Sequence, residues 1–160
     1  MKKMFKWLVI TVVIIILDQI TKYFALQELL LHQAVHIFPG FNLTLMHNTG
    51  AAFSFLSQAG GWQRWFFIGL ASTISIAILI WMHGLSAKKR WLPAALAFVL
   101  GGAIGNLLDR INYGYVVDFI EVYYKNYYWP AFNIADSAIT IGAIMLIIDA
   151  IWLNDTETEH

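Results

Sequence analysis

Four aspartates lie in or beside strongly apolar stretches of the chain: Asp18, Asp109, Asp118 and Asp136. An ionised carboxylate is costly within hydrocarbon, so acids at membrane depth usually face a protein interior or a cavity. Two carboxylates held close together do not both ionise readily, so one keeps a proton while the other accepts a proton from water. Such a pair supplies the base and the acid that are needed to hydrolyse a peptide bond without a serine or cysteine nucleophile and without a metal.

Asp118 and Asp136 are the predicted catalytic pair because both have apolar neighbours. Asp118 lies between a valine and a phenylalanine, and an isoleucine and an alanine precede Asp136. A hydrophobic surround raises the pKa of a carboxyl group and separates the titrations of two adjacent acids. On the residues alone, two other interpretations stay open: a proton or ion pathway through a small transporter, and a set of acids that fix loops.

The other two acids have basic residues close to them in the sequence. Lys22 follows Asp18 by four residues, which places both side chains on one face of a helix within ion-pair reach. The pair is interpreted either as a structural salt bridge with a snorkelling lysine or as support for the site. Arg110 directly follows Asp109, which suits Asp109 to an ion pair or a loop clamp. The alternative partner of Arg110 is a lipid phosphate.

The composition is that of an integral membrane protein. The 160 residues are 59% hydrophobic and 12% charged, with a mean hydropathy of +0.64, whereas soluble domains carry roughly 25% charged residues. Ten basic residues balance ten acidic ones, so no basic field exists to attract nucleic acid. The absence of cysteine excludes disulfides and thiolate chemistry. His32 and His36 lack a nearby third ligand, so neither a metal nor a cofactor is predicted.

Four apolar runs predict four transmembrane helices, at about residues 7–26, 65–83, 91–108 and 132–153 of a single domain covering residues 1–160. Each run approaches the roughly 20 residues that cross ~30 Å of hydrocarbon. Between the first two runs, Phe38-Pro39-Gly40 indicates a turn. Phe41–Leu45 alternates with a period of two, which predicts a short strand or hairpin.

The distribution of positive charge predicts the orientation of the chain. Six of the ten basic residues lie in the first six positions or in the turn between the second and third runs. By the positive-inside rule, both termini and this turn are cytoplasmic, and all four aspartates lie in the outer half of the membrane or just beyond it. A transporter would need acids that continue inward, but the second run has no ionisable residue before His83.

Five motifs in the chain resemble the lipoprotein signal peptidase family, the signal peptidase II of bacteria. They are Asp18-Gln19-Ile20-Thr21-Lys22, Asn48-Thr49-Gly50-Ala51-Ala52-Phe53-Ser54, Asn106-Leu107-Leu108-Asp109-Arg110, Val116-Val117-Asp118-Phe119 and Phe132-Asn133-Ile134-Ala135-Asp136-Ser137. The motifs follow the family's order, spread over nearly the whole chain and show no departure at a motif position.

The resemblance implies an aspartic endopeptidase that removes the signal peptide from diacylglyceryl-modified prolipoproteins, cleaving on the amino side of the lipidated cysteine. It implies Asp118 and Asp136 as the catalytic residues. The residues implied to support the site or the substrate are Asp18, Asn48, Gly50, Asn106, Asp109, Arg110, Asn133 and Ala135, to which the ion-pair spacing adds Lys22. The two asparagines Asn106 and Asn133 would donate amide hydrogen bonds to carboxylates or to substrate backbone, or else anchor loops.

The resemblance also implies a fold and a location. We expect an all-α membrane protein with four transmembrane helices, a small extracytoplasmic β-cradle and a short periplasmic helix, located in the bacterial cytoplasmic (inner) membrane as a monomer. Expected partners are prolipoprotein substrates, membrane lipids and inhibitors of the globomycin type. A helical bundle without activity is the remaining alternative, and it would tolerate alanine at either aspartate.

Overall fold

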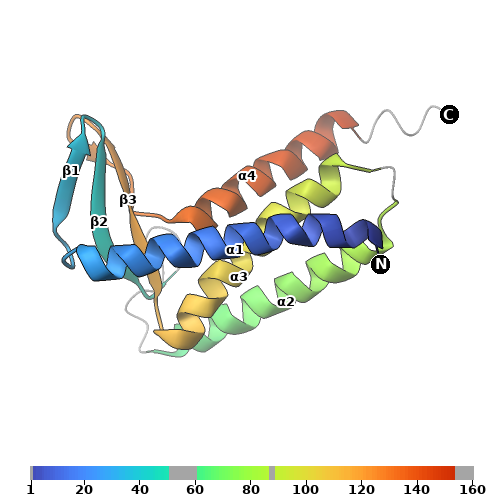
Figure 1. The fold of residues 1–160 in the computed structure, drawn as a ribbon, viewed down its shortest axis with the longest axis horizontal. Coiled ribbons are helices and arrows are strands. Elements are labelled where there is room, and N and C mark those ends of the chain that lie inside the picture. The colour runs from blue at the N-terminus through green and yellow to red at the C-terminus, as the bar shows by residue number, and fades with distance from the viewer. Residues whose placement is uncertain (1, 51–60, 87–88, 154–160) are drawn as a thin grey trace.

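The computed structural model describes residues 2–50, 61–86 and 89–153. Within these residues, four long helices run roughly side by side, with a small sheet at one end of the bundle (Figure 1). The helices are α1 (Lys2–Glu28), α2 (Trp62–Gly84), α3 (Trp91–Asn112) and α4 (Ile134–Ile148), and α4 continues into the π-helical turn η2 (Asp149–Leu153). All four are long and apolar enough to cross a membrane, which confirms the expected four-helix layout.

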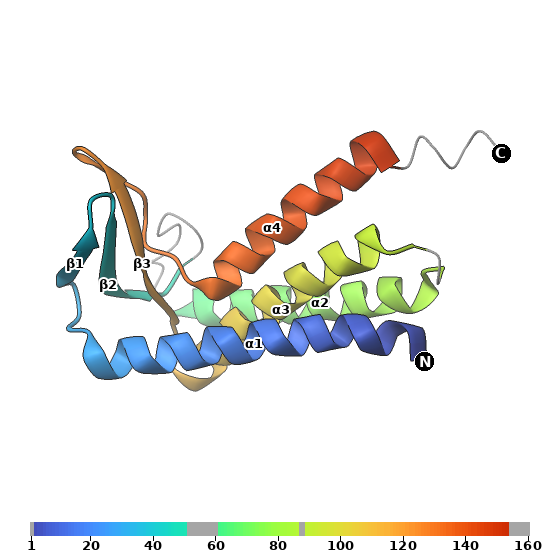
Figure 2. The same ribbon diagram turned by 45° about the horizontal axis from the view of Figure 1, so that its top comes forward.

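Helix α3 occupies the centre of the bundle and packs against the other three helices. Its glycines permit this close approach, because a Cβ atom on Gly101 would lie 2.9 Å from the Ile14 side chain of α1 and one on Gly105 would lie 2.6 Å from Asp18 Oδ2. Figure 2 shows α4 leaning away from α1 toward its C-terminal end, while α4 stays packed on α3, where Trp91 Nε1 donates to the carbonyl of Met145 at 2.8 Å. The N-terminal end of α4 is therefore the part held closest to α1.

The outward faces of the helices are apolar. Val12, Ile16 and Phe66 are half-exposed, as is Ile144 on α4. In water such a surface would be unfavourable, whereas in a bilayer it meets hydrocarbon of the same polarity. Most of the buried polar and charged side chains lie at the end of the bundle that meets the sheet.

The sheet has the strand order β1-β2-β3-β4 with antiparallel pairing. Its strands are β1 (Ala34–Phe38), β2 (Phe41–Asn48), β3 (Val116–Tyr124) and β4 (Tyr127–Tyr128). The predicted strand and hairpin around Phe41–Leu45 are confirmed. Gly40 makes the hairpin turn with a φ of 92°, a conformation that glycine adopts without strain.

Pairing between β2 and β3 joins two distant parts of the sequence. Met46 lies opposite Asp118, and Asn48 lies opposite Val116. This register brings the second and fourth motifs side by side. Apart from α1 to α4 and η2, the described residues contain no separate helix beside the sheet, so the short periplasmic helix stays a prediction.

Candidate active site

Asp136 lies in the first turn of α4, directly after the segment that links the sheet to this helix. Asn133 is the N-cap residue, and its Oδ1 accepts a hydrogen bond of 2.8 Å from the backbone N–H of Asp136. Side-chain capping of this kind satisfies a backbone donor that has no partner inside the helix. The carboxylate itself accepts a 2.7 Å bond from Asn106 Nδ2 of α3. Backbone and side chain of Asp136 are thus both held by asparagines.

Asp118 lies on β3 and is 2% exposed. Its Oδ1 accepts a 2.7 Å hydrogen bond from Asn133 Nδ2, and its Oδ2 accepts a 3.0 Å bond from Asn48 Nδ2 of the neighbouring strand. Burial, followed by the charge of Asp136, raises the pKa of Asp118 to about 7. The two amide donors oppose this increase without cancelling it. The pKa of Asp118 therefore moves in the direction predicted from the sequence, through burial.

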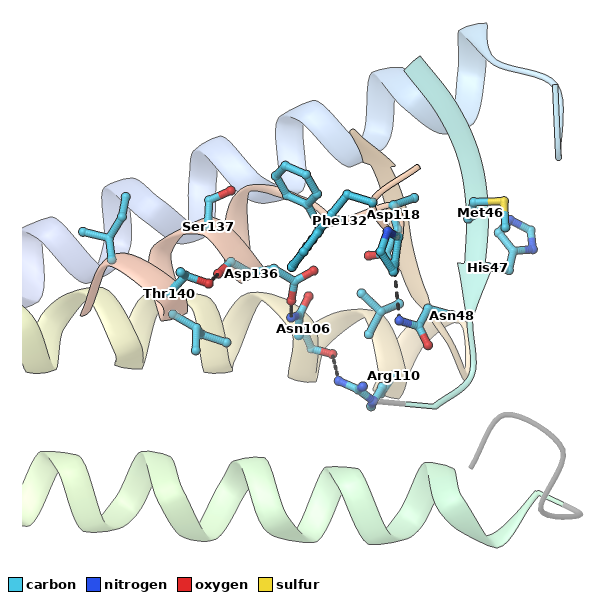
Figure 3. Close-up of a pocket in the computed structure, with 16 residues that line it drawn as sticks. Met46, His47, Asn48, Asn106, Arg110, Asp118, Phe132, Asp136, Ser137 and Thr140 are labelled. Atoms are coloured by element: carbon cyan, nitrogen blue, oxygen red, sulfur yellow. Dashed lines mark hydrogen bonds between the residues drawn. The ribbon is translucent and has the colours of Figure 1, made fainter. Parts of the chain in front are cut away.

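Both aspartates line one cavity of about 760 Å³. Figure 3 shows them reaching the same space from β3 and from α4, with Asn48, Asn106 and Arg110 around them. Apolar side chains also line this cavity, among them Trp129, Phe132, Ile139 and Ile141. Two acids that share a cavity with such side chains can activate a water molecule beside an apolar substrate segment. Within residues 2–50, 61–86 and 89–153, no group of acids and histidines is placed to hold a metal ion.

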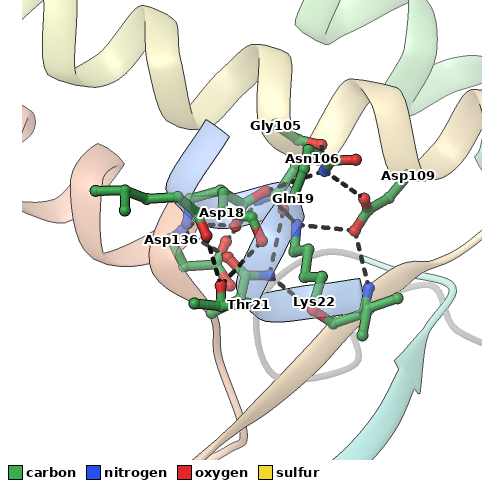
Figure 4. A network of polar contacts seen from close by, with 12 residues as sticks. Asp18, Gln19, Thr21, Lys22, Gly105, Asn106, Asp109 and Asp136 are labelled. Atoms are coloured by element: carbon green, nitrogen blue, oxygen red, sulfur yellow. Dashed lines mark hydrogen bonds and ion pairs between the residues drawn. The ribbon is translucent and has the colours of Figure 1, made fainter. Parts of the chain in front are cut away.

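Asp18 and Asp109 anchor the residues that immediately precede the two cavity aspartates. Asp18 Oδ1 accepts a 2.9 Å bond from the N–H of Ala135, and Asp109 Oδ2 accepts a 3.0 Å bond from the N–H of Val117. Lys22 joins the two anchors, with its Nζ 2.8 Å from Asp18 Oδ2 and 2.8 Å from Asp109 Oδ2 (Figure 4). The predicted ion pair between Asp18 and Lys22 is confirmed.

Asp109 forms an ion pair and holds the chain at Val117, the two roles predicted for it, but its ion-pair partner is Lys22 and not the neighbouring Arg110. Within the described residues, the guanidinium group donates to backbone carbonyls, at 2.9 Å to Gly50 and at 3.4 Å to Asn106, and lies 5.0 Å from the ring centroid of Phe67. Adjacent helical residues point in different directions, so Asp109 pairs with Lys22 from α1 instead. Arg110 fixes the chain at Gly50, next to the Asn48 amide that donates to Asp118.

Two polar residues of the site region were missed by the analysis of the sequence. Gln19 Nε2 donates to Asp109 Oδ1 at 2.9 Å and to Asp18 Oδ2 at 3.2 Å. The signal for Gln19 was its position inside the first motif. Arg64 of α2 donates from Nε to the carbonyl of Arg110 and from Nη2 to that of Ile111, both at 2.9 Å, and so holds the end of α3. No local pattern in the sequence marks this contact.

The molecule combines four membrane-capable helices and a small sheet with a cavity that holds two acids, the buried Asp118 and the partly buried Asp136. These features define a multi-pass membrane protein with the residues that an aspartic peptidase needs. The family described as Signal peptidase (SPase) II matches residues 10–152. The chain belongs to this family of peptidases.

Relatives and solved structures agree with this assignment. The lipoprotein signal peptidase of Alteromonas mediterranea is 50% identical over 155 residues, covering 97% of this chain and 85% of the relative. That of Acinetobacter baumannii is 56% identical over 147 residues, covering 92% of this chain and 84% of the relative. A solved structure described as a bacterial membrane enzyme, at 2.3 Å resolution, superposes with a TM-score of 0.85 at 33% identity and covers 97% of this chain and 92% of its own. A second structure, at 1.9 Å resolution, gives a TM-score of 0.79 at 32% identity, covering 92% and 93%.

Proposed function

We propose that this chain removes the signal peptide from diacylglyceryl-modified prolipoproteins, cleaving on the amino side of the lipidated cysteine with Asp118 and Asp136 as the catalytic residues. The observation that carries the proposal is the placement of these two carboxylates in one cavity, where β3 meets the start of α4. The family match supplies the reaction class, and the names of the relatives supply the substrate class.

The chemistry uses one ionised and one protonated carboxyl group. Burial raises the pKa of Asp118 to about 7, which suits this residue to act as the proton donor. Asp136 lies in the first turn of α4, where the helix dipole favours negative charge, which suits it to act as the base. Asp136 takes a proton from water, the water attacks the scissile carbonyl carbon, and Asp118 donates its proton to the carbonyl oxygen. When the C–N bond of the tetrahedral intermediate breaks, Asp136 gives the proton that it took from water to the departing amine. Asp118 takes a proton back from a hydroxyl group of the intermediate, which leaves a carboxylic acid product and restores the pair.

The remaining residues support this pair. Asn48, Asn106 and Asn133 donate to the two carboxylates. The other supporting residues are Asp18, Lys22, Asp109 and Ala135, which fix the backbone before each aspartate, and Gly50 and Arg110, which fix the end of β2. Residues 1–160 act as a single peptidase domain that needs no cofactor.

The proposed location is the bacterial cytoplasmic (inner) membrane, with both termini in the cytoplasm and the cavity toward the outer face. The basic residues at the N-terminus and around residues 88–90 support this orientation. The acyl chains of the substrate can then stay in the bilayer while the scissile bond reaches the cavity. We further propose that the protein is a monomer and that it has a short periplasmic helix beside the sheet. We also propose that compounds of the globomycin type inhibit it.

Cleavage of a diacylglyceryl-modified prolipoprotein by purified protein tests the assignment. We expect the wild type to cleave, and Asp118→Asn and Asp136→Asn to fold but lose cleavage. Asp149→Asn is the matched control, because this aspartate is also buried but lies in η2, at the other end of the fourth span. Cleavage retained by a folded variant at position 118 or 136 would remove that residue from the chemistry, and an inactive wild type would return the transporter as the better hypothesis.

A further inference from the structure

Lys22 is almost completely buried, with 2% of its surface exposed, and all three of its ammonium hydrogens have acceptors. Besides Asp18 and Asp109, its Nζ donates to Asn106 Oδ1 at 2.9 Å. An ammonium group has three donors and no acceptor. The atom of Asn106 that faces Lys22 must therefore be the amide oxygen.

This constraint fixes the direction of the hydrogen bonds that reach the cavity. With Oδ1 of Asn106 turned to Lys22, its Nδ2 is left to donate to Asp136. The same Oδ1 also accepts from Asn133 Nδ2 at 3.2 Å, which turns the amide nitrogen of Asn133 toward Asp118. The oxygen of Asn133 is then free to cap α4. A single ammonium group thus orients two amides so that each cavity carboxylate faces an N–H donor.

We propose that Lys22 is a positioning residue of the peptidase, which acts through Asn106 and Asn133 to keep amide donors directed at Asp136 and Asp118. The proposal rests on the proposed function, because it assigns a task within the same site. Lys22 does not line the cavity. It contributes by fixing the direction of the hydrogen bonds that lead through Asn106 and Asn133 to the two aspartates. Hydrogen bonds donated to a carboxylate favour its ionised form. These hydrogen bonds therefore help to keep one member of the pair ionised, so that it can act as the base.

The charged groups around the pair come from several elements. Helix α1 contributes Asp18 and Lys22, helix α3 contributes Asp109 and Arg110, and β2 places His47 at the cavity wall. Removing Lys22 alone would leave two buried carboxylates with one fewer cation, a change that disrupts folding in its own right. The test therefore has to keep the net charge constant.

The double variant Asp18→Asn/Lys22→Met removes one positive and one negative charge. The asparagine oxygen at position 18 can still accept from the N–H of Ala135, so that anchor is retained. The ammonium donor to Asn106 is lost. We expect kcat to fall about 10- to 100-fold, the cost of one hydrogen bond to a charged group, with KM unchanged. The acidic limb of the kcat pH profile should move to higher pH, because the base is harder to ionise.

Thr11→Val is the matched control for this variant. It removes another buried polar contact between α1 and α3, the 3.1 Å hydrogen bond from Thr11 Oγ1 to the carbonyl of Ala97, and Thr11 has no described contact with Asp18, Lys22 or Asn106. We expect a lower melting temperature with wild-type kcat and an unmoved pH profile. A folded double variant with wild-type kcat and pH profile would overturn the proposal, as would the same displacement of the profile in the control.

A second measurement applies if the double variant does not fold, and it needs no substrate. In wild-type protein labelled with ¹⁵N-asparagine, the side-chain amide signal of Asn106, assigned by its loss in Asn106→Ala, should shift as the aspartate pair titrates. An amide signal of Asn106 that does not respond to pH would refute the hydrogen-bond chain. Failure of the proposed function is recognised separately, by wild-type cleavage in Asp118→Asn.

Discussion

Replacement of Asp118 by asparagine should change stability in opposite directions at high and low pH. The folded protein raises the pKa of Asp118 from 3.8 to about 7, so between these values the folded state binds more protons at this site than the unfolded state. Stability contributed by this group is therefore present at low pH and is lost as pH rises through this window. Asparagine carries no charge, so the contribution of this position to stability no longer depends on pH in the variant.

The expected size of the change in stability follows from the pKa shift of Asp118 and from the hydrogen bonds that its carboxylate accepts. A difference of about three pKa units corresponds to about 4 kcal/mol of penalty on the ionised form above pH 7. Asn48 and Asn133 both donate to the carboxylate, and an asparagine offers only one oxygen, so the substitution leaves a donor unpaired at a cost of about 1–3 kcal/mol. We expect Asp118→Asn to be more stable than the wild type by about 1–3 kcal/mol at pH 8 and less stable by a similar amount at pH 4.

Thermal unfolding in one detergent, followed by intrinsic fluorescence from pH 4 to pH 9, measures this difference. Asp149→Asn, measured in the same buffers, reports effects of pH on the detergent and on the remaining acids. A difference between Asp118→Asn and the wild type that keeps one sign across the whole range would refute the argument that Asp118 is penalised by burial when ionised.

Two further substitutions test the packing and the polar contacts of the site. Gly105→Ala places a methyl group 2.6 Å from Asp18 Oδ2, which should cost about 1–3 kcal/mol of stability and lower kcat by displacing this anchor; an unchanged melting temperature and kcat would contradict the close packing. Asn48→Ala removes one of the two donors to Asp118 and should move the ionisation of Asp118 to higher pH. Because Asp118 is the proposed proton donor, the basic limb of the kcat pH profile should move with it; a profile identical to that of the wild type would show that Asn48 does not influence the carboxylate.

The sequence was sufficient to predict the number of helices and the strand around Phe41–Leu45, because apolar run length and period-two alternation are local properties. It also predicted the pair Asp18 and Lys22, since residues four apart lie on one face of a helix. The motifs identified the polar residues of the site, but only as members of a family pattern. Local information therefore placed each residue on its element.

Local patterns in the sequence do not predict which residues of different elements contact one another. Nothing near Asp118 in the sequence indicates that Met46 lies opposite it in the sheet. Adjacency in sequence suggested Arg110 as the partner of Asp109, whereas the bundle supplies Lys22 from another helix. Both outcomes depend on the register of β2 against β3 and on the rotation of α1 against α3, which are set by packing across the whole chain.

The buried cluster of Asp18, Lys22 and Asp109 is better explained by positioning than by stability. Moving charges out of water is costly, and well-packed apolar residues often stabilise a protein as much as a buried ion pair. An apolar trio, however, would offer no acceptors to the N–H groups of Ala135 and Val117. Each of these residues immediately precedes a cavity aspartate, one on a helix and one on a strand. The cluster therefore fixes the relative placement of the two elements whose carboxylates are proposed to act on the same water molecule.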